Sequence, residues 1–301
     1  MKKSVVIVAA CICVGIVGCG SNAKVDTKAD TTHKEKEVEE VIDEVITEVT
    51  KTTQEETSNV QEKEGQAAEN QVLVAMEEYP LDVKAEDGTL LFRVSQNCPN
   101  VTIDGLSDVA DQINDFYLKE KEVFDAKVET YANLARADYK KLSPEDKKNY
   151  QEYLTELEKD GKIEADIKLT YNLKRADMKC ISVVKDSYEI TSEYPYSFRE
   201  ATVFDASTGE RLEFERIFED EDKAKSFITD YLSKILRKKY KHLLSEDYEK
   251  EIEALLDGNT WYLSKGGVVV ICNESVISPY AELTEITIPY SKFVDFSCQY
   301  Q

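Results

Sequence analysis

Side chains that perform acid–base or nucleophilic chemistry are scarce in this sequence. His242 is the only histidine in the part of the chain expected to fold, and it lies in a basic run typical of a surface helix. Zinc hydrolysis and polysaccharide deacetylation need several histidine ligands, and serine or cysteine triads need a histidine base. Ser182 and Lys185 match the Ser-x-x-Lys pattern of penicillin-binding enzymes, but that motif requires a helix start and this run is strand-like. We therefore expect no enzyme; the alternative is an envelope enzyme that acts on wall polymers with carboxylates, Tyr or Ser alone.

Binding motifs for metals and cofactors are also missing from the sequence. It contains no glycine-rich dinucleotide motif, no phosphate-binding loop and no calcium-loop pattern. The acidic run Glu219–Asp222 could attract a divalent cation, but it stands where a helix is expected to begin, and acids are favoured there by the helix dipole. The sequence therefore predicts no metal and no cofactor.

The seven cysteines fall into two groups. Three lie in the first 19 residues, and the other four are Cys98, Cys180, Cys272 and Cys298. Four cysteines allow three pairings, between which the sequence does not choose. Cys180 and Cys272 lie in apolar, strand-like runs, so we expect buried thiols there, with a bridge between these two as the alternative.

The N-terminus has the features of an export signal. Lys2 and Lys3 precede an apolar stretch of 15 residues, which is too short to span a membrane. The residues before Cys19 then resemble the bacterial lipobox, in which a cysteine thiol accepts a diacylglycerol and becomes the lipidated N-terminus. We predict a signal peptide at 1–18, lipidation of Cys19 and a location on the outer face of the cell membrane. An ordinary secretory leader and an uncleaved anchor are the alternatives.

The segment after Cys19 is acidic and lacks the residues that build a core. Residues 20–75 contain no aromatic side chain and no proline, and they carry 14 acidic and 6 basic residues. Such a segment cannot bury enough apolar surface to fold, so we predict a disordered tether at 19–75. Between Val38 and Val49, apolar residues recur at helical spacing. That stretch is either a transiently helical linker or a short partner-binding helix.

The charge balance restricts the class of partner. The chain has a net charge of −22, and residues 76–301 alone carry 46 acidic and 30 basic residues. This excess disfavours nucleic acid, whose binding depends on Lys and Arg, and favours a basic protein. The alternative is that the charge only keeps an exported protein soluble.

The remainder of the chain alternates between strand and helix patterns. An Asp87-Gly88 turn predicts a hairpin between 81–86 and 89–94, Ser107 is expected to cap a helix to about 137, and Ser143 and Pro144 begin another. The later elements are expected as strands at 162–175, 178–191 and 194–204, helices at 221–244 and 245–257, and strands at 260–263, 267–272 and 285–289. This order predicts an α+β fold, with mixed or antiparallel sheets covered by helices, in two subdomains at 76–195 and 196–301.

Two stretches resemble a known family. FDASTGERLEFERIF (204–218) and WYLSKGGVVVICNESVISPYAELTEITIPYSKF (261–293) are similar to the extracellular domain of unknown function shared by RsiV-type anti-sigma factors and PdaC-type peptidoglycan deacetylases. Family members commonly carry Gly-Gly-Ala-His-Gly before the first stretch, where this chain has Tyr194–Arg199. Any role of that motif is therefore not carried over. Because RsiV-type domains bind lysozyme, the resemblance implies a binding domain.

Three aromatic residues alternate along one predicted strand. Tyr194, Tyr196 and Phe198 are separated by single residues and therefore share one strand face. They are either core residues or an exposed ligand surface. The combined expectation is a lipid-anchored, extracellular binding protein of the bacterial envelope, whose ligand is a cell-wall component such as peptidoglycan or a basic wall-attacking protein such as lysozyme.

Overall fold

The computed structural model describes residues 71–190, 195–278, 281–293 and 297–301. The predicted signal peptide, Cys19, nearly all of the predicted tether and Tyr194 lie outside these residues. The described residues all belong to a single compact unit. No helix in the described ranges has the length and apolar character needed to cross a membrane.

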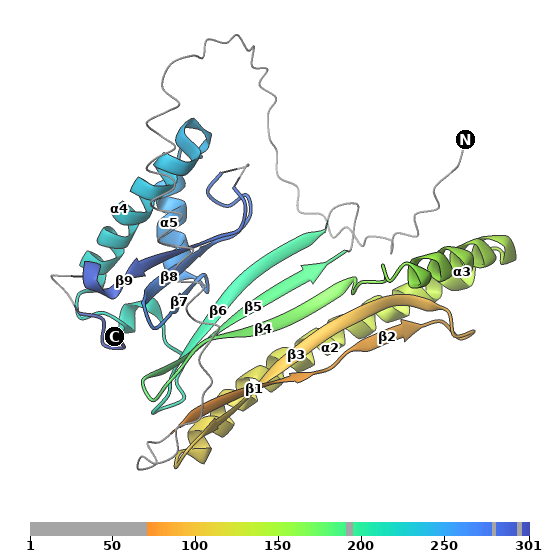
Figure 1. Cartoon of the computed structure of the whole chain (residues 1–301), viewed down its shortest axis with the longest axis horizontal. Helices are drawn as coiled ribbons and strands as arrows, with labels where there is room; N and C mark the ends of the chain where they lie inside the picture. Colours follow the sequence, from red (N-terminus) through yellow and green to blue (C-terminus); the bar gives the residue numbers. More distant parts are fainter. Residues whose placement is uncertain (1–70, 191–194, 279–280, 294–296) are drawn as a thin grey trace, which may run out of the picture. The chain divides into compact units, whose positions relative to one another are not determined.

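The first part of the chain builds a six-stranded sheet in the order β1-β3-β4-β5-β6, with β2 also paired to β3. Among the described strands, β3 and β4 form the one parallel pair. Figure 1 shows α2 running along β3. The elements are β1 (Val72–Glu78), β2 (Leu81–Lys84), β3 (Leu90–Ile103), α2 (Ser107–Lys141), α3 (Pro144–Lys159), β4 (Ile167–Ala176), β5 (Cys180–Glu189) and β6 (Tyr196–Asp205).

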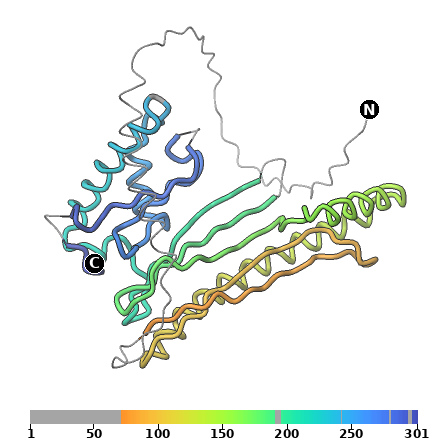
Figure 2. Tube along the Cα trace, viewed as in Figure 1, coloured from red at the N-terminus to blue at the C-terminus, as the bar shows by residue number. Residues whose placement is uncertain are grey.

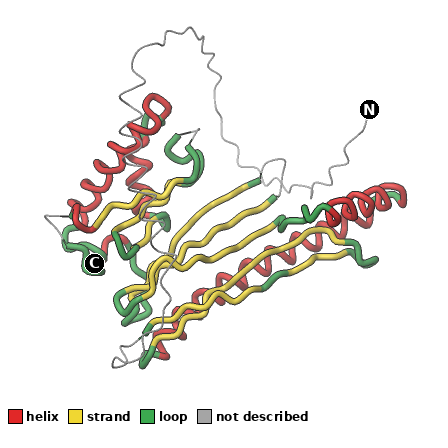
Figure 3. Tube along the Cα trace, viewed as in Figure 1, coloured by secondary structure: helices red, strands yellow, loops and turns green. Residues whose placement is uncertain are grey.

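The rest of the chain builds a three-stranded antiparallel sheet with its own helices. Figure 3 shows that each sheet has helices beside it, and Figure 2 follows the chain from the orange β1 to the blue strand β9. The strand order is β7-β8-β9. The elements are η1 (Phe214–Arg216), α4 (Glu221–Tyr240), η2 (Lys241–Leu243), α5 (Tyr248–Asp257), β7 (Trp261–Leu263), β8 (Gly267–Cys272), β9 (Thr284–Pro289) and η3 (Tyr290–Lys292).

The first half of β5 and the last half of β6, which pair with each other, are largely buried on both faces, and this explains their apolar runs. On one face, Ile181 and Phe204 join α2 in a core that contains the fully buried Tyr117. The rings of Tyr117 and Phe204 meet edge to face, with centroids 5.8 Å apart. On the other face, Val184 and Val203 join α4, α5 and the second sheet in a separate core. The two sheets therefore share β5 and β6 as a common wall.

The α+β class and most predicted elements are confirmed. The hairpin turns at Gly88, which has a φ of 85°, and the Ser143 side chain accepts a hydrogen bond from the Asp146 amide at 3.1 Å as the cap of α3. The cap predicted at Ser107 is wrong, because Leu106 occupies that position and no side chain caps α2. Leu106 packs against the core instead, so burial decides the helix start.

Two predicted boundaries also differ from the structure. Strand β1 begins at Val72, inside the range assigned to the tether, and its residues pair with β3 from Val72–Ile103 to Glu78–Asn97. The boundary at 195/196 separates β6 from its own sheet, since β6 pairs with β5 along its whole length, from Tyr196 to Asp205. Backbone pairing thus places both segments in the first sheet.

Candidate binding cleft

Strand β6 is the last strand of its sheet, and side chains and loops close most of its outer edge. Asn273, which is 2% exposed, accepts a hydrogen bond from the Arg199 amide and donates one to the Arg199 carbonyl, both at 2.8 Å. Further along, the Ala201 amide donates to the Asn259 carbonyl at 2.6 Å, and the Leu212 amide donates to the Val203 carbonyl at 2.7 Å. These contacts satisfy the backbone groups that an edge strand otherwise leaves unpaired.

The beginning of β6, before Arg199, has no such cover in the structure's described part. Tyr196 is 56% exposed, and its ring stacks on that of Phe198 with centroids 6.1 Å apart and an interplanar angle of 8°. The two rings therefore share one face of the strand, as their spacing predicts. The result is an aromatic surface at the open end of β6.

Phe198 leads from this surface into a cleft of about 320 Å³ between β6 and α5. The accessible part of its lining is mostly apolar, which is typical of ligand sites. The lining residues are Phe198, Glu200, Glu251, Ala254, Leu255, Gly258, Asn259, Thr260, Asn273 and Val276. The Thr260 hydroxyl fixes the end of α5 by donating to the Leu255 carbonyl at 2.7 Å.

Two carboxylates give the cleft a negative charge. Glu200 pairs with Lys185 at 2.8 Å, but Lys185 also pairs with Glu120 of α2 at 3.0 Å. Burial lowers the pKa of Lys185, but hydrogen bonding to Glu200 and the charge of Glu120 outweigh burial and raise that pKa overall. Glu251 accepts a hydrogen bond from the Ser245 hydroxyl at 2.8 Å and forms no ion pair with a described residue. One lysine is therefore shared between Glu120 and Glu200, and Glu251 has no cationic partner among the described residues.

The side chain of Arg199 fixes which residues of β6 point to each face of the strand. Its side chain extends to the opposite face, where it binds Asp186 at 2.6 Å and Glu285 of β9 at 3.0 Å. The hydrogen bond to Asp186 raises the pKa of Arg199, so the guanidinium remains charged. Because strand side chains alternate, anchoring Arg199 on one face directs Phe198 and Glu200 to the other.

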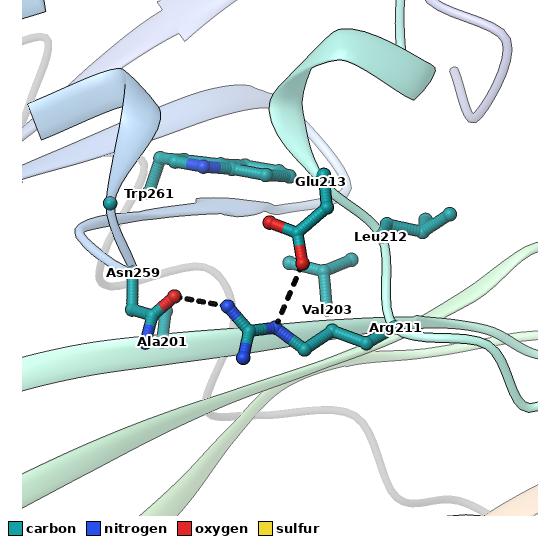
Figure 4. A pocket seen from close by; sticks show the side chains of 8 residues that line it. Ala201, Val203, Arg211, Leu212, Glu213, Asn259 and Trp261 are labelled. Atoms are coloured by element: carbon teal, nitrogen blue, oxygen red, sulfur yellow. Dashed lines mark hydrogen bonds and ion pairs between the residues drawn. The ribbon is translucent and has the colours of Figure 1, made fainter.

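A smaller cavity lies beside the cleft and is too small for a ligand. It has a volume of about 10 Å³, room for about one water molecule. Figure 4 shows Arg211 in this cavity, with its guanidinium bonded to Asn259 and, at 3.5 Å, to Glu213. Asn259 thus contributes to both hollows, and these contacts keep the loop between α5 and β7 in place.

The other sequence candidates have structural roles where the structure describes them. Ser182 and Lys185 lie on opposite faces of β5, because Ser182 is near Val184 and Cys180 whereas Lys185 reaches α2. Asp220 caps α4 by accepting a hydrogen bond from the Lys223 amide at 3.2 Å. Within the described residues, no group of three or more His, Cys, Asp or Glu side chains could hold a metal ion.

The structure therefore brings together Tyr196 and Phe198, while Tyr194 lies outside the described residues. The α5 side of the cleft was not predicted from the sequence. Glu251 and Asn273 follow the end of β6 by more than 40 residues, and neither stands in a recognisable motif. These residues come together through the tertiary contacts between β6 and the loops along its edge. A local sequence pattern does not show such contacts.

Comparisons with known proteins give a family of unknown function and several solved structures, including the following two. A crystal structure of a DUF3298 family member from Bacteroides fragilis aligns with 75% of this chain and 94% of its own, at 16% identity and a TM-score of 0.49. One from Pseudomonas aeruginosa aligns with 76% and 95%, at 13% identity and a TM-score of 0.43. No curated protein matches the chain. Residues 215–291 match the family model described as "Protein of unknown function (DUF3298)".

Proposed function

We propose that this chain is an extracellular binding lipoprotein of the bacterial cell envelope, anchored through lipid on Cys19. Its cleft between β6 and α5 binds a basic protein. The observation that carries the proposal is the combination of an aromatic pair, of which Tyr196 is exposed, with carboxylates that outnumber the cations paired with them. The lipobox-like leader supports the location, and the resemblance to RsiV-type domains makes lysozyme the first basic protein to test.

The chemistry of the cleft suits an Arg or Lys side chain. A cation over an aromatic face gains about 0.5–1 kcal/mol at an exposed site and about 2 kcal/mol when water is removed. Tyr196 and Phe198 provide such faces, and Glu251 provides a carboxylate without an ion-pair partner among the described residues. A neutral ligand would use only the aromatic part of this site.

The charge of the whole chain favours the same class of ligand. With a net charge of −22, the protein attracts basic proteins over a distance and so increases their rate of encounter. This long-range attraction is screened at about 0.15 M salt, where the Debye length is about 8 Å, whereas close contacts in the cleft are screened less. Salt therefore separates specific binding from general attraction.

The test is a titration of the purified protein with lysozyme at about 0.15 M salt. We expect saturable 1:1 binding, and we expect Glu251→Gln to weaken it by about tenfold, since a close charge pair is lost. Glu253→Gln is the matched control, because Glu253 is an exposed residue of the same helix that does not line the cleft. Binding seen only at low salt, or equal loss in the two variants, would contradict the proposal.

A second candidate ligand is a cell-wall glycan. The Tyr196 ring, which is exposed and stacks nearly parallel to the Phe198 ring, offers an apolar face on which a sugar ring can lie. Sedimentation with insoluble peptidoglycan tests this candidate, and retention that Tyr196→Ala abolishes would favour the glycan over lysozyme. Release of acetate or sugar fragments during the same incubation would contradict a binding-only role and favour the envelope enzyme.

The anchor has its own test, independent of the ligand. We expect Cys19→Ala to move the protein from the membrane fraction to the medium, or to leave an unprocessed precursor, because the lipidated thiol is lost. Unchanged lipid labelling of the variant would rule out Cys19 as the anchor.

A further inference from the structure

The four described cysteines lie in two separate cores, and this separation limits how they can pair. All four are buried free thiols. Cys98 belongs to the core between the first sheet and α2, whereas Cys180, Cys272 and Cys298 belong to the core around the second sheet. A disulfide needs Cα atoms within about 7 Å. The three cysteines of the second core are therefore the candidates for a bridge.

The segment 298–301 folds back against the start of β5, where Cys180 lies. Cys298 forms a β-bridge with Phe218, and the Gln301 carbonyl accepts a hydrogen bond from the Lys179 ammonium. The Tyr300 hydroxyl donates to Asp205 at 2.9 Å, and Asp205 is the residue paired with Cys180 across β5 and β6. The segment thus contacts both the chain neighbour and the strand partner of Cys180.

The electrostatic surroundings of the thiols agree with these contacts. Burial raises the pKa of Cys180 to about 12, and the charge of Cys298 adds to this rise. Arg175, which is 5% exposed, acts on both thiols and lowers their pKa values. Burial also raises the pKa of Cys272 to about 12, but the charge that acts on it is Lys239 and no other cysteine contributes. Cys272 precedes Asn273, which bonds to Arg199, whereas Cys180 pairs with Asp205, six residues further along β6. At about 3.3 Å per strand residue, Cys272 is therefore remote from Cys180.

We propose that Cys180 and Cys298 form a disulfide when the chain folds in contact with a disulfide oxidant such as glutathione disulfide. The Cys298 thiol loses its proton, and its thiolate attacks the oxidant to give a mixed disulfide and one glutathione thiolate. The Cys180 thiolate then attacks the Cys298 sulfur and releases the second glutathione. The protein loses two electrons and two protons, and the oxidant is reduced to two thiols.

The bridge would fix the segment 298–301 to the wall shared by the two sheets. It closes a loop of more than 100 residues, and long loops gain most from closure because the unfolded chain loses the most freedom. We expect the melting temperature to rise by about 5–15 °C on oxidation. This inference concerns the core and does not depend on the ligand of the cleft.

The test is refolding of the full chain from denaturant with glutathione and glutathione disulfide, followed by alkylation and peptide mapping. We expect a peptide pair linking Cys180 and Cys298, with Cys98 and Cys272 recovered as alkylated thiols. Cys298→Ser should abolish the rise in melting temperature, whereas Cys272→Ser, a change at another buried thiol of the same core, should retain it. Recovery of Cys180 as an alkylated thiol in the wild type, or its linkage to Cys272, would overturn the proposal.

Discussion

The two ends of strand β6 differ in how their outer edge is covered. From Arg199 to Asp205, the edge is closed by Asn273, by the loop at Asn259 and by the turn after the strand. At Tyr196, the same strand leaves an aromatic side chain 56% exposed beside a cleft. The difference teaches that one strand can serve two purposes, with stability at its closed end and recognition at its open end.

The largest effect is expected from opening the closed end. In Asn273→Ala, the amide and carbonyl of Arg199 lose their partners at a buried edge, and each unsatisfied group costs about 1–3 kcal/mol. We expect a loss of about 2–4 kcal/mol in the free energy of unfolding, measured with urea. The control is Asn172→Ala, which removes one hydrogen bond from an exposed residue to Asp186 and should cost about 0.5 kcal/mol or less. Equal losses would mean that the clamp does not hold the edge.

A smaller, pH-dependent effect is expected at the turn that ends β6. Asp205 accepts hydrogen bonds from the Ser207 hydroxyl at 2.6 Å and the Tyr300 hydroxyl at 2.9 Å. Burial raises the pKa of Asp205, but the hydrogen bonds from Ser207 and Tyr300 outweigh burial and hold the pKa below its ordinary value. The charged form therefore stabilises the fold at neutral pH, and this contribution is lost as the pH falls through the folded-state pKa.

Asp205→Asn retains the size of the side chain and removes its charge. We expect the variant to lose about 1 kcal/mol at pH 7, and we expect the difference from the wild type to shrink as the pH falls below 4. Urea unfolding at several pH values measures this. A difference that stays constant with pH would show that the carboxylate charge does not matter here.

The smallest effect on stability is expected at the open end. Tyr196→Ala removes an exposed ring whose main contact is Phe198, so we expect a change of about 0.5 kcal/mol or less. Urea unfolding measures this change, and Tyr153→Ala is the control because Tyr153 is an equally exposed tyrosine of helix α3. A loss of about 2 kcal/mol or more would place Tyr196 in the core and remove the distinction between the two ends.

The sequence predicts local features of the fold better than it predicts the surroundings of β6. Local signals were sufficient for the Asp87-Gly88 turn and the Ser143 cap, because their hydrogen bonds join residues close in the chain. Alternation placed Tyr196 and Phe198 on one face, but it could not say what covers that face. The cleft beside that face is lined by Glu251 and Asn273, whose positions depend on how α5 and β8 pack.

Strand β1 and the start of α2 were mispredicted for a similar reason. The tether pattern ends without a turn signal, and the run that starts at Val72 becomes a strand because β3 is long enough to pair with both β1 and β2. Leu106 takes the cap position of α2 because it packs against the core, which outweighs the local preference for Ser107. In both cases, distant partners decide the local structure.

The measurement that tests the division of β6 most directly is a lysozyme titration of the wild type, Tyr196→Ala and Asp205→Asn at about 0.15 M salt and pH 7. We predict saturable binding by the wild type, a dissociation constant at least about tenfold higher for Tyr196→Ala, and a value within about twofold of the wild type for Asp205→Asn. No saturable binding by the wild type, or equal weakening by the two substitutions, would contradict a recognition site at the open end.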